Sequence, residues 1–199
     1  DNNNDNFTDV TLQERISIFN KWNFIRKDNK LFTLAGRFFY EDRWGGEMNW
    51  NKSYRGTNLV YGESIYTSRQ EVIGKYQLPV SEKIFFSFFA TNHVQDSYDG
   101  STKHAAQQQI GFGQLTWDKK VGSHDLLIGS AYRYQFYNDN TTATVAPERT
   151  HIFSVFGQDE IKLAKMHSVL LGSRLDYNNN HGYIYTPRIA YKWKFTDSD

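Results

Sequence analysis

Apolar and polar residues alternate with a period of two along most of this chain, which constrains its fold more than any other feature. In residues 183–195 the odd positions are mainly aromatic or aliphatic and the even positions carry most of the cations. Residues 31–40, 83–91, 126–137 and 168–177 alternate in the same way. Because successive side chains of a strand point to opposite faces, the pattern predicts β-strands with one apolar and one polar face. The alternation changes phase around 109–117, where we expect a bulge.

Nine such segments read as strands, mostly longer than the ~5 to 6 residues of an ordinary globular strand. We expect an all-β fold, an antiparallel up-and-down meander. The predicted strands are 11–25, 30–40, 59–76, 82–94, 104–118, 124–137, 150–163, 167–177 and 183–195.

The connections between these segments alternate in length. We expect short connections at 26–29, 77–81, 119–123 and 164–166, longer ones at 41–58, 95–103 and 138–149, and one of medium length at 178–182. Short turns at one end of a meander and long loops at the other are typical of an outer-membrane barrel, with the turns in the periplasm. Tyrosine and tryptophan near the strand ends fit its aromatic girdles, namely Trp22, Tyr40, Tyr137, Tyr177, Tyr183 and Trp193.

Composition removes several other classes of protein. The 199 residues carry a net charge of +1, which gives no electrostatic case for a nucleic-acid partner, and the absence of cysteine excludes disulfides and thiol chemistry. No apolar run approaches the ~20 residues that a membrane-spanning helix needs, and the mean hydropathy is −0.68. Since no Gly-x-Ser-x-Gly, His-Glu-x-x-His or P-loop pattern occurs, we expect no enzyme.

The topology also predicts a partial barrel. If residues 1–10 form an outside loop and strands occupy 11–195, residues 196–199 fall in a periplasmic turn after an odd number of strands, whereas closed bacterial barrels have an even number. We therefore expect an open, curled sheet whose first and last strands are unpaired edges. The alternatives are a small, closed outer-membrane barrel without transport and a soluble β-sandwich that binds a ligand.

Several motifs between 150 and 195 resemble the barrel of TonB-dependent outer-membrane receptors. They run from Phe153 to Ile161, from Gly172 to Asp176, and through His181-Gly182 and Thr186-Pro187-Arg188-Ile189. Residues 43–47 and 110–117 look like the cobalamin and siderophore receptor branch of Bacteroides-like bacteria. The resemblance implies an outer-membrane location, a barrel of 22 strands, an internal plug domain and a TonB box, and the last two would precede residue 1. It implies import of a corrinoid, an iron-siderophore or haem, with membrane lipid, plug and TonB as partners.

Candidate functional residues follow from this topology. The polar sides of the last two strands would face the lumen and contact the plug or steer anionic chelates, unless they only line a solvated interior; these residues are Arg174, Asp176, Arg188 and Lys192. Aromatic and basic residues near the outside loops are ligand-binding candidates, or else they clamp the loops; these are Arg43, Trp44, Tyr54, Arg55, Tyr98, Tyr137 and His181. Asp96 and Asp99 are candidate calcium ligands in the predicted loop 95–103, where plain turn chemistry is the alternative.

Overall fold

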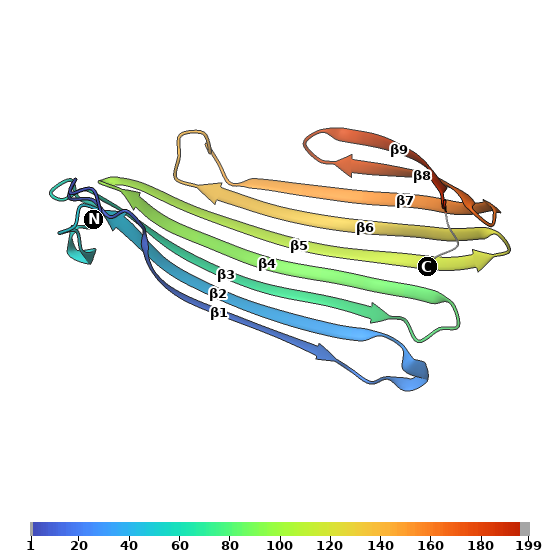
Figure 1. The fold of residues 1–199 in the computed structure, drawn as a ribbon. Coiled ribbons are helices and arrows are strands. Elements are labelled where there is room, and N and C mark those ends of the chain that lie inside the picture. Colours follow the sequence, from blue (N-terminus) through green and yellow to red (C-terminus); the bar gives the residue numbers. More distant parts are fainter. Residues whose placement is uncertain (1, 196–199) are drawn as a thin grey trace.

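The computed structural model describes residues 2–195, which form nine antiparallel strands in a single sheet (Figure 1). The strands follow one another across the sheet in the order of the sequence. The predicted all-β meander of nine strands is therefore confirmed. The strands are β1 (Leu12–Asn23), β2 (Phe32–Gly46), β3 (Gly62–Gln77), β4 (Lys83–Asp99), β5 (Thr102–Val121), β6 (His124–Asp139), β7 (Glu148–Ala164), β8 (His167–Asn178) and β9 (Gly182–Trp193).

The sheet is open and curled (Figure 1), with β8 and β9 turned out of the plane of β2 to β6. Within the described residues, β1 pairs only with β2 and β9 pairs only with β8, so the predicted unpaired edges are confirmed. All nine strands lie in one layer, which contradicts the β-sandwich alternative. Two 3-10 helices, η1 (Lys27–Asn29) and η2 (Lys52–Tyr54), are short turns, and the described part of the chain contains no helix long and apolar enough to cross a membrane.

The connections lie at two ends of the sheet, but their lengths depart from the prediction. One end, on the left of Figure 1, holds 47–61, 100–101, 140–147 and 179–181, and the other holds 24–31, 78–82, 122–123 and 165–166.

Two of the predicted long connections, 41–58 and 95–103, are wrong in their extent. β2 runs on through Gly46, and only Gly100 and Ser101 separate β4 from β5. Polar residues such as Gln95 and Asp96 continue the ladder here, where they pair with Ala106 and Ala105, although their composition resembles a loop.

The predicted boundaries at the two ends of the chain are close to those observed. Phe7 forms an isolated bridge with Glu47, so the predicted loop 1–10 contacts the connection 47–61. The predicted turn 196–199 lies outside the described residues.

The register divides the side chains between two faces. Face A contains the row Phe88, Gly113, Tyr132, Phe153 and Tyr177, and face B contains the row Glu71, Thr91, Ile110 and Gln135. Large apolar side chains of face A are exposed, among them Ile18 (59%), Phe153 (54%) and Ile189 (77%). Because exposed large apolar side chains that gather on one face mark contacts with protein or lipid, face A is a candidate contact surface.

Face A changes character along the strands. On β4 the outward residues from Ile84 to Ala90 are apolar, and those from Asn92 onward are mainly polar. The same change separates Val72 from Gln70 on β3 and Gly111 from Gln109 on β5. The apolar part, here called the band, adjoins the end of the sheet that holds 78–82, and the polar part, here called the upper wall, adjoins the end that holds 47–61.

The bulge that we expected around 109–117 is not there. β5 keeps a continuous register with both neighbours across this stretch, and the register shift lies instead between Lys162 and Ala164. The pattern changes phase because two glycines, Gly111 and Gly113, occupy face A while Ile110 and Phe112 occupy face B.

Candidate functional site

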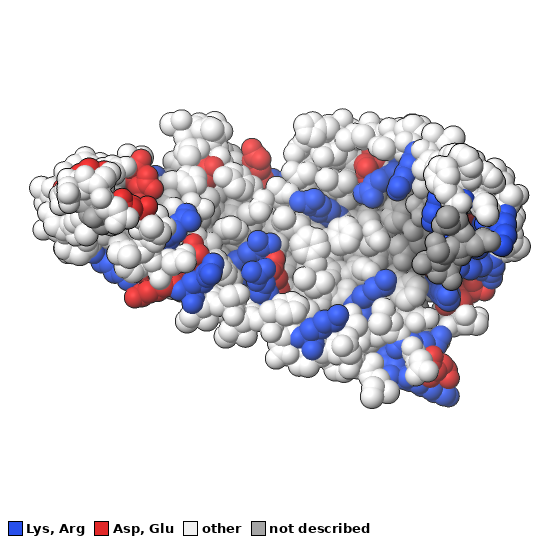
Figure 2. Space-filling view, viewed as in Figure 1, with Lys and Arg blue, Asp and Glu red and all other residues white. Residues whose placement is uncertain are grey.

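Face B of β1 to β3 carries a lattice of arginines and glutamates. Each glutamate lies between two arginines and is largely shielded, with 13 to 14% of its side chain exposed. Two carboxylates among four guanidinium groups leave the lattice with a net positive charge. The pairs are Arg15–Glu41 (3.9 Å), Arg43–Glu41 (4.0 Å), Arg37–Glu71 (3.6 Å) and Arg69–Glu71 (2.5 Å). On the face of the molecule seen in Figure 2, basic and acidic side chains lie interspersed in this manner.

A second polar cluster on face B joins β7 to β8. Arg174 donates from Nε to both carboxylate oxygens of Asp176 (2.8 and 3.0 Å) and from a terminal nitrogen to Oγ of Ser154 (2.8 Å). The hydroxyl of Ser154, which is buried, donates to Asp176. The charge of Arg174 is thus compensated on its own strand.

The other two predicted lumen residues lie on the same face. Arg188 pairs with Gly172 and Lys192 pairs with Ser168 in the β8–β9 ladder. Neither has an ion pair within the part of the chain that the structure describes. The four residues therefore share face B as expected, and their role toward a plug or a ligand stays a prediction.

Next to this cluster, face B is hollowed. A cavity of about 280 Å³ is lined by Phe89 and Phe112 on one side and by Arg133, Arg174 and Asp176 on the other. Aromatic rings and guanidinium groups around one hollow suit a partner that has both flat apolar and anionic parts.

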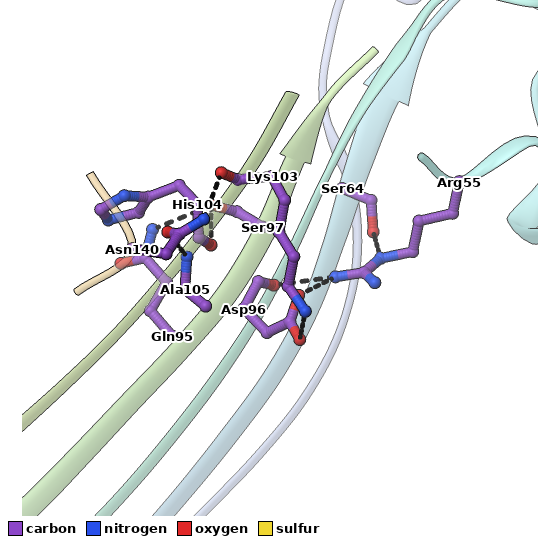
Figure 3. A network of polar contacts seen from close by, with 9 residues as sticks. All are labelled: Arg55, Ser64, Gln95, Asp96, Ser97, Lys103, His104, Ala105 and Asn140. Atoms are coloured by element: carbon purple, nitrogen blue, oxygen red, sulfur yellow. Dashed lines mark hydrogen bonds and ion pairs between the residues drawn. The ribbon is translucent and has the colours of Figure 1, made fainter. Parts of the chain in front are cut away.

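Arg55 fixes the connection 47–61 to the upper wall of face A, and Figure 3 shows its contacts. Its guanidinium group donates to Oγ of Ser64 (3.0 Å) and to Oδ1 of Asp96 (2.8 Å). It also lies over the rings of Tyr66 and Tyr98, at 4.2 and 4.4 Å from the centroids. Because only 17% of the Arg55 side chain is exposed, these contacts form a partly desolvated latch.

Two further polar contacts support the same end of the sheet. Lys52 donates to the buried Asp42 (2.6 Å), and this hydrogen bond raises the pKa of Lys52. Asn140 donates to the carbonyl of Lys103 and accepts from the amide of Ala105 (Figure 3), which extends the β5–β6 pairing beyond β6.

The structure separates most of the predicted ligand-binding residues. It brings only Arg55 and Tyr98 into mutual contact, and there they belong to the latch on face A. Trp44 lies on face A, where the ammonium of Lys52 is 5.2 Å from the centroid of its ring. Arg43 and Tyr137 lie on face B, Tyr54 lies in η2, and His181 lies in the exposed connection 179–181.

One expectation about a single residue needs correction. Tyr137, predicted for an aromatic girdle, is on face B, where its hydroxyl donates to Asp139 (2.8 Å). Sequence reasoning also missed Ser64 and Tyr66, since neither belongs to a motif and only the β2–β3 connection folding back onto the sheet brings them to Arg55.

The structure does not bring the two candidate calcium ligands together. Asp96 and Asp99 both lie in β4, three positions apart, and therefore point to opposite faces. Asp96 accepts from Arg55 and lies 3.6 Å from Lys103, while Asp99 accepts from the hydroxyl of Tyr61 (2.8 Å), which raises the pKa of Tyr61. No cluster of three or more acidic or histidine ligands occurs among residues 2–195, and calcium binding stays a prediction.

The family described as TonB dependent receptor-like, beta-barrel matches residues 1–198. The iron-regulated outer membrane virulence protein of two Vibrio cholerae serotype O1 strains is 31% identical over 77 residues, which are 37% of this chain and 12% of that protein. The crystal structure of the siderophore receptor PirA from Pseudomonas aeruginosa has a TM-score of 0.65 at 12% identity, covering 94% of this chain and 31% of that one. This structural similarity concerns the fold alone, and the chain spans less than a third of either relative.

Proposed function

This chain belongs to the TonB-dependent receptor-like β-barrel family, and from this premise we propose that it forms part of the wall of a receptor that imports a large, scarce nutrient. The family is one of outer-membrane receptors, so the chain is placed in the outer membrane of a Gram-negative bacterium. The observation that carries the proposal is the two-faced sheet, whose aromatic face A is exposed and whose face B carries a positively charged lattice.

The two faces of the sheet contact different surroundings in a barrel wall. In a bilayer, the band of face A contacts lipid, and burial there stabilises the wall by about 25 cal/mol per Å² of apolar surface removed from water. Face B then lines the lumen, where polar and charged side chains stay hydrated. The upper wall of β3 to β5 rises above the membrane and carries the connection 47–61 on its outside.

An iron chelate of the siderophore type is the ligand class that we favour. Its support is the net positive charge of the arginine lattice, which attracts anionic ligands, together with the iron-regulated Vibrio protein and the siderophore receptor among the similar proteins. A cobalamin-type corrinoid and haem are the alternatives. Uptake would also need a plug domain in the lumen and TonB as the energy-coupling partner, which we propose from the family.

Binding to the full-length protein tests this function. The protein, purified from outer membranes, is titrated with ferric siderophores, haem and cyanocobalamin, and uptake is compared in cells with and without the gene. We expect saturable binding of one ferric siderophore and loss of its uptake in the deletion strain. Absence of binding and uptake for all three classes would contradict import, and a preference for cyanocobalamin or haem would overturn the siderophore assignment.

A further inference from the structure

Cationic side chains on face B are sorted along the strands. Every lysine that the register places on this face lies within two residues of a strand end, always at the end of the sheet that holds 78–82 and 165–166. On β1, β3 and β9, which also carry arginine on face B, the arginine lies farther from that end. The six lysines, here called the lysine belt, are Lys21, Lys75, Lys83, Lys120, Lys162 and Lys192. The proposed function makes this end periplasmic, so the arginines line the lumen and the lysine belt lines part of its exit.

The lysine belt borders a pocket on face B of β7 to β9. Ser168 of β8 pairs with Lys162 of β7 and with Lys192 of β9, so the serine lies between two lysines in one row across the sheet. The pocket has a volume of about 290 Å³, and its lining also contains Lys165 and Lys194. We call it the lysine pocket.

The chain neutralises little of the charge in the lysine pocket. Glu160 is the one carboxylate among its described lining residues, and it accepts a hydrogen bond from the hydroxyl of Ser168 (3.0 Å). Among residues 2–195, Lys162, Lys192 and Lys194 form no ion pair. In the arginine lattice, by contrast, each guanidinium group has a glutamate partner. The lysine pocket therefore keeps an excess of positive charge that a ligand can neutralise.

Cations continue along face B from the hollow at Arg133 and Arg174 to the lysine pocket. On β9, Ile184 lines the hollow and Lys192 lines the pocket. Arg188 lies between them on the same face, four residues from each, which is about 13 Å along a strand. Because Arg188 has no ion pair among the described residues, an anion that moves along β9 stays near uncompensated positive charge.

We propose that the lysine pocket is a second, weaker anion site, which holds the imported anionic chelate as it leaves the lumen. This inference rests on the proposed function, because it needs face B to line the lumen and 165–166 to lie in the periplasm. One multiply charged anion can neutralise several ammonium groups at once. Lysine suits a site of release because its ammonium is a mobile, strongly hydrated point charge, whereas arginine holds an anion in the fixed geometry of its planar fork.

The charge of the pocket is measured with a thiol probe in the full-length protein. The 199 residues contain no cysteine, so Ser168→Cys places one thiol in this part of the protein, between Lys162 and Lys192. Its reaction rates with an anionic sulfonatoethyl and a cationic trimethylammonioethyl methanethiosulfonate are followed by mass spectrometry. Each rate is divided by the rate of the same reagent with a free thiol in solution, and wild type reports any reaction elsewhere.

We expect the anionic reagent to react about tenfold faster than the cationic one, since a positively charged cleft concentrates anions by about 10- to 1,000-fold. Adding Lys162→Gln and Lys192→Gln should bring the ratio of the two rates close to one. Lys119→Gln is the matched control and should leave the ratio unchanged, because Lys119 lies at the same end of the sheet but on face A, where it pairs with Glu82.

Equal rates for the two reagents in Ser168→Cys would overturn the proposal. Faster reaction of the cationic reagent, or no reaction with either, would overturn it as well, because an acidic or other segment of the protein, such as the plug, would then fill the pocket. If Ser168→Cys does not fold, Ala190→Cys gives the same comparison, since Ala190 lies on face B of β9 between Arg188 and Lys192.

Uptake tests the place of the pocket on the exit path. In cells, the double variant Lys162→Gln, Lys192→Gln should take up the ferric siderophore that binds the wild-type protein about fivefold more slowly, because the local concentration of the anion falls. Its affinity for that siderophore should equal that of wild type, since the arginine lattice is unaltered, and Lys119→Gln should keep both affinity and uptake. Unchanged uptake in the double variant would overturn the exit role.

Failure of this inference is distinguishable from failure of the proposed function. Normal uptake in wild type together with equal rates for the two thiol reagents rejects the lysine pocket alone. Absence of uptake in wild type for all three ligand classes rejects import, and with it the exit role, whatever the thiol reagents show.

Discussion

At the scale of single residues, Arg55 shows how a side chain acquires its role from its surroundings. Its charge and its aromatic neighbours in sequence suggest a ligand contact. In the structure the same chemistry is used within the chain, because Asp96, Tyr66 and Tyr98 surround the guanidinium group and leave little of it exposed.

Replacing Arg55 by alanine should release the connection 47–61. Loss of a charged hydrogen bond and of two cation–π contacts weakens the docking by about 2 kcal/mol. The measurement is the rate of limited proteolysis within 47–61 on intact cells. Lys103→Ala is the control, because this lysine lies 3.6 Å from the same carboxylate but is half exposed, and its loss should cost under about 1 kcal/mol. Equal cleavage of the two variants would contradict a specific latch.

Asp139 should keep its hydrogen bonds in mild acid. Its carboxylate accepts from the hydroxyl and the amide of Thr141 (both 2.7 Å) and from Tyr137, and these bonds hold the pKa of Asp139 well below its usual value of 3.8. A depressed folded-state pKa means that this stabilisation is present above the unfolded-state pKa and is lost as pH falls through the folded-state pKa.

The amide resonance of Thr141 followed by NMR should therefore show its inflection well below pH 3.8. The variant Asp139→Asn should remove the inflection and increase hydrogen exchange at Thr141. An inflection near the usual aspartate value would show that the carboxylate is not held by these donors.

At the scale of elements, glycines on the strands have two distinct roles. Phe156 on β7 covers Gly129 on β6, and a Cβ atom at Gly129 would lie 2.4 Å from the ring and 2.8 Å from the carbonyl oxygen of Leu115. At Gly157 the nearest atom would be 3.9 Å away. Gly129 is needed because the ring of Phe156 occupies the space of a side chain. At Gly157 a methyl group has room.

Gly129→Ala should therefore destabilise the sheet by about 1 to 3 kcal/mol, because the added methyl group displaces Phe156 from its position over β6. Gly157→Ala should be neutral or slightly stabilising, since alanine loses less backbone entropy on folding than glycine. The measurement is the temperature at which the gel mobility of each variant changes on heating, compared with that of wild type. A similar temperature for both would contradict the ring packing at Gly129.

At the scale of the whole molecule, the sheet has one end with the connections 47–61 and 140–147 and another with 78–82 and 122–123. The proposed function puts the first end outside the cell and the second in the periplasm. Because the chain contains no cysteine, single cysteines report on this orientation without background.

Thr142→Cys should react with a membrane-impermeant maleimide on intact cells, and Ser81→Cys should react only after the outer membrane is opened. Both residues are exposed and lie in connections at opposite ends of the sheet. The reverse pattern would invert the orientation, and labelling of both on intact cells would rule out a wall that crosses the membrane.

The sequence by itself determined the class of fold, the number of strands and their two faces. Alternation with period two is a local property, and in a pleated strand it places successive side chains on opposite faces. It also placed Arg174, Asp176, Arg188 and Lys192 on one face. It did not determine where β2 and β4 end. The polar composition of the upper wall is typical of loops, although the backbone of these residues continues the strand pairing.

Only the tertiary structure decided which residues meet across strands. The latch at Arg55, the pairing of Arg174 with Asp176 and Ser154, and the separation of Asp96 from Asp99 all depend on register and on how a connection folds back onto the sheet. Contacts between residues distant in sequence are set by the packing of neighbouring strands, and the pattern within one strand holds no information about them.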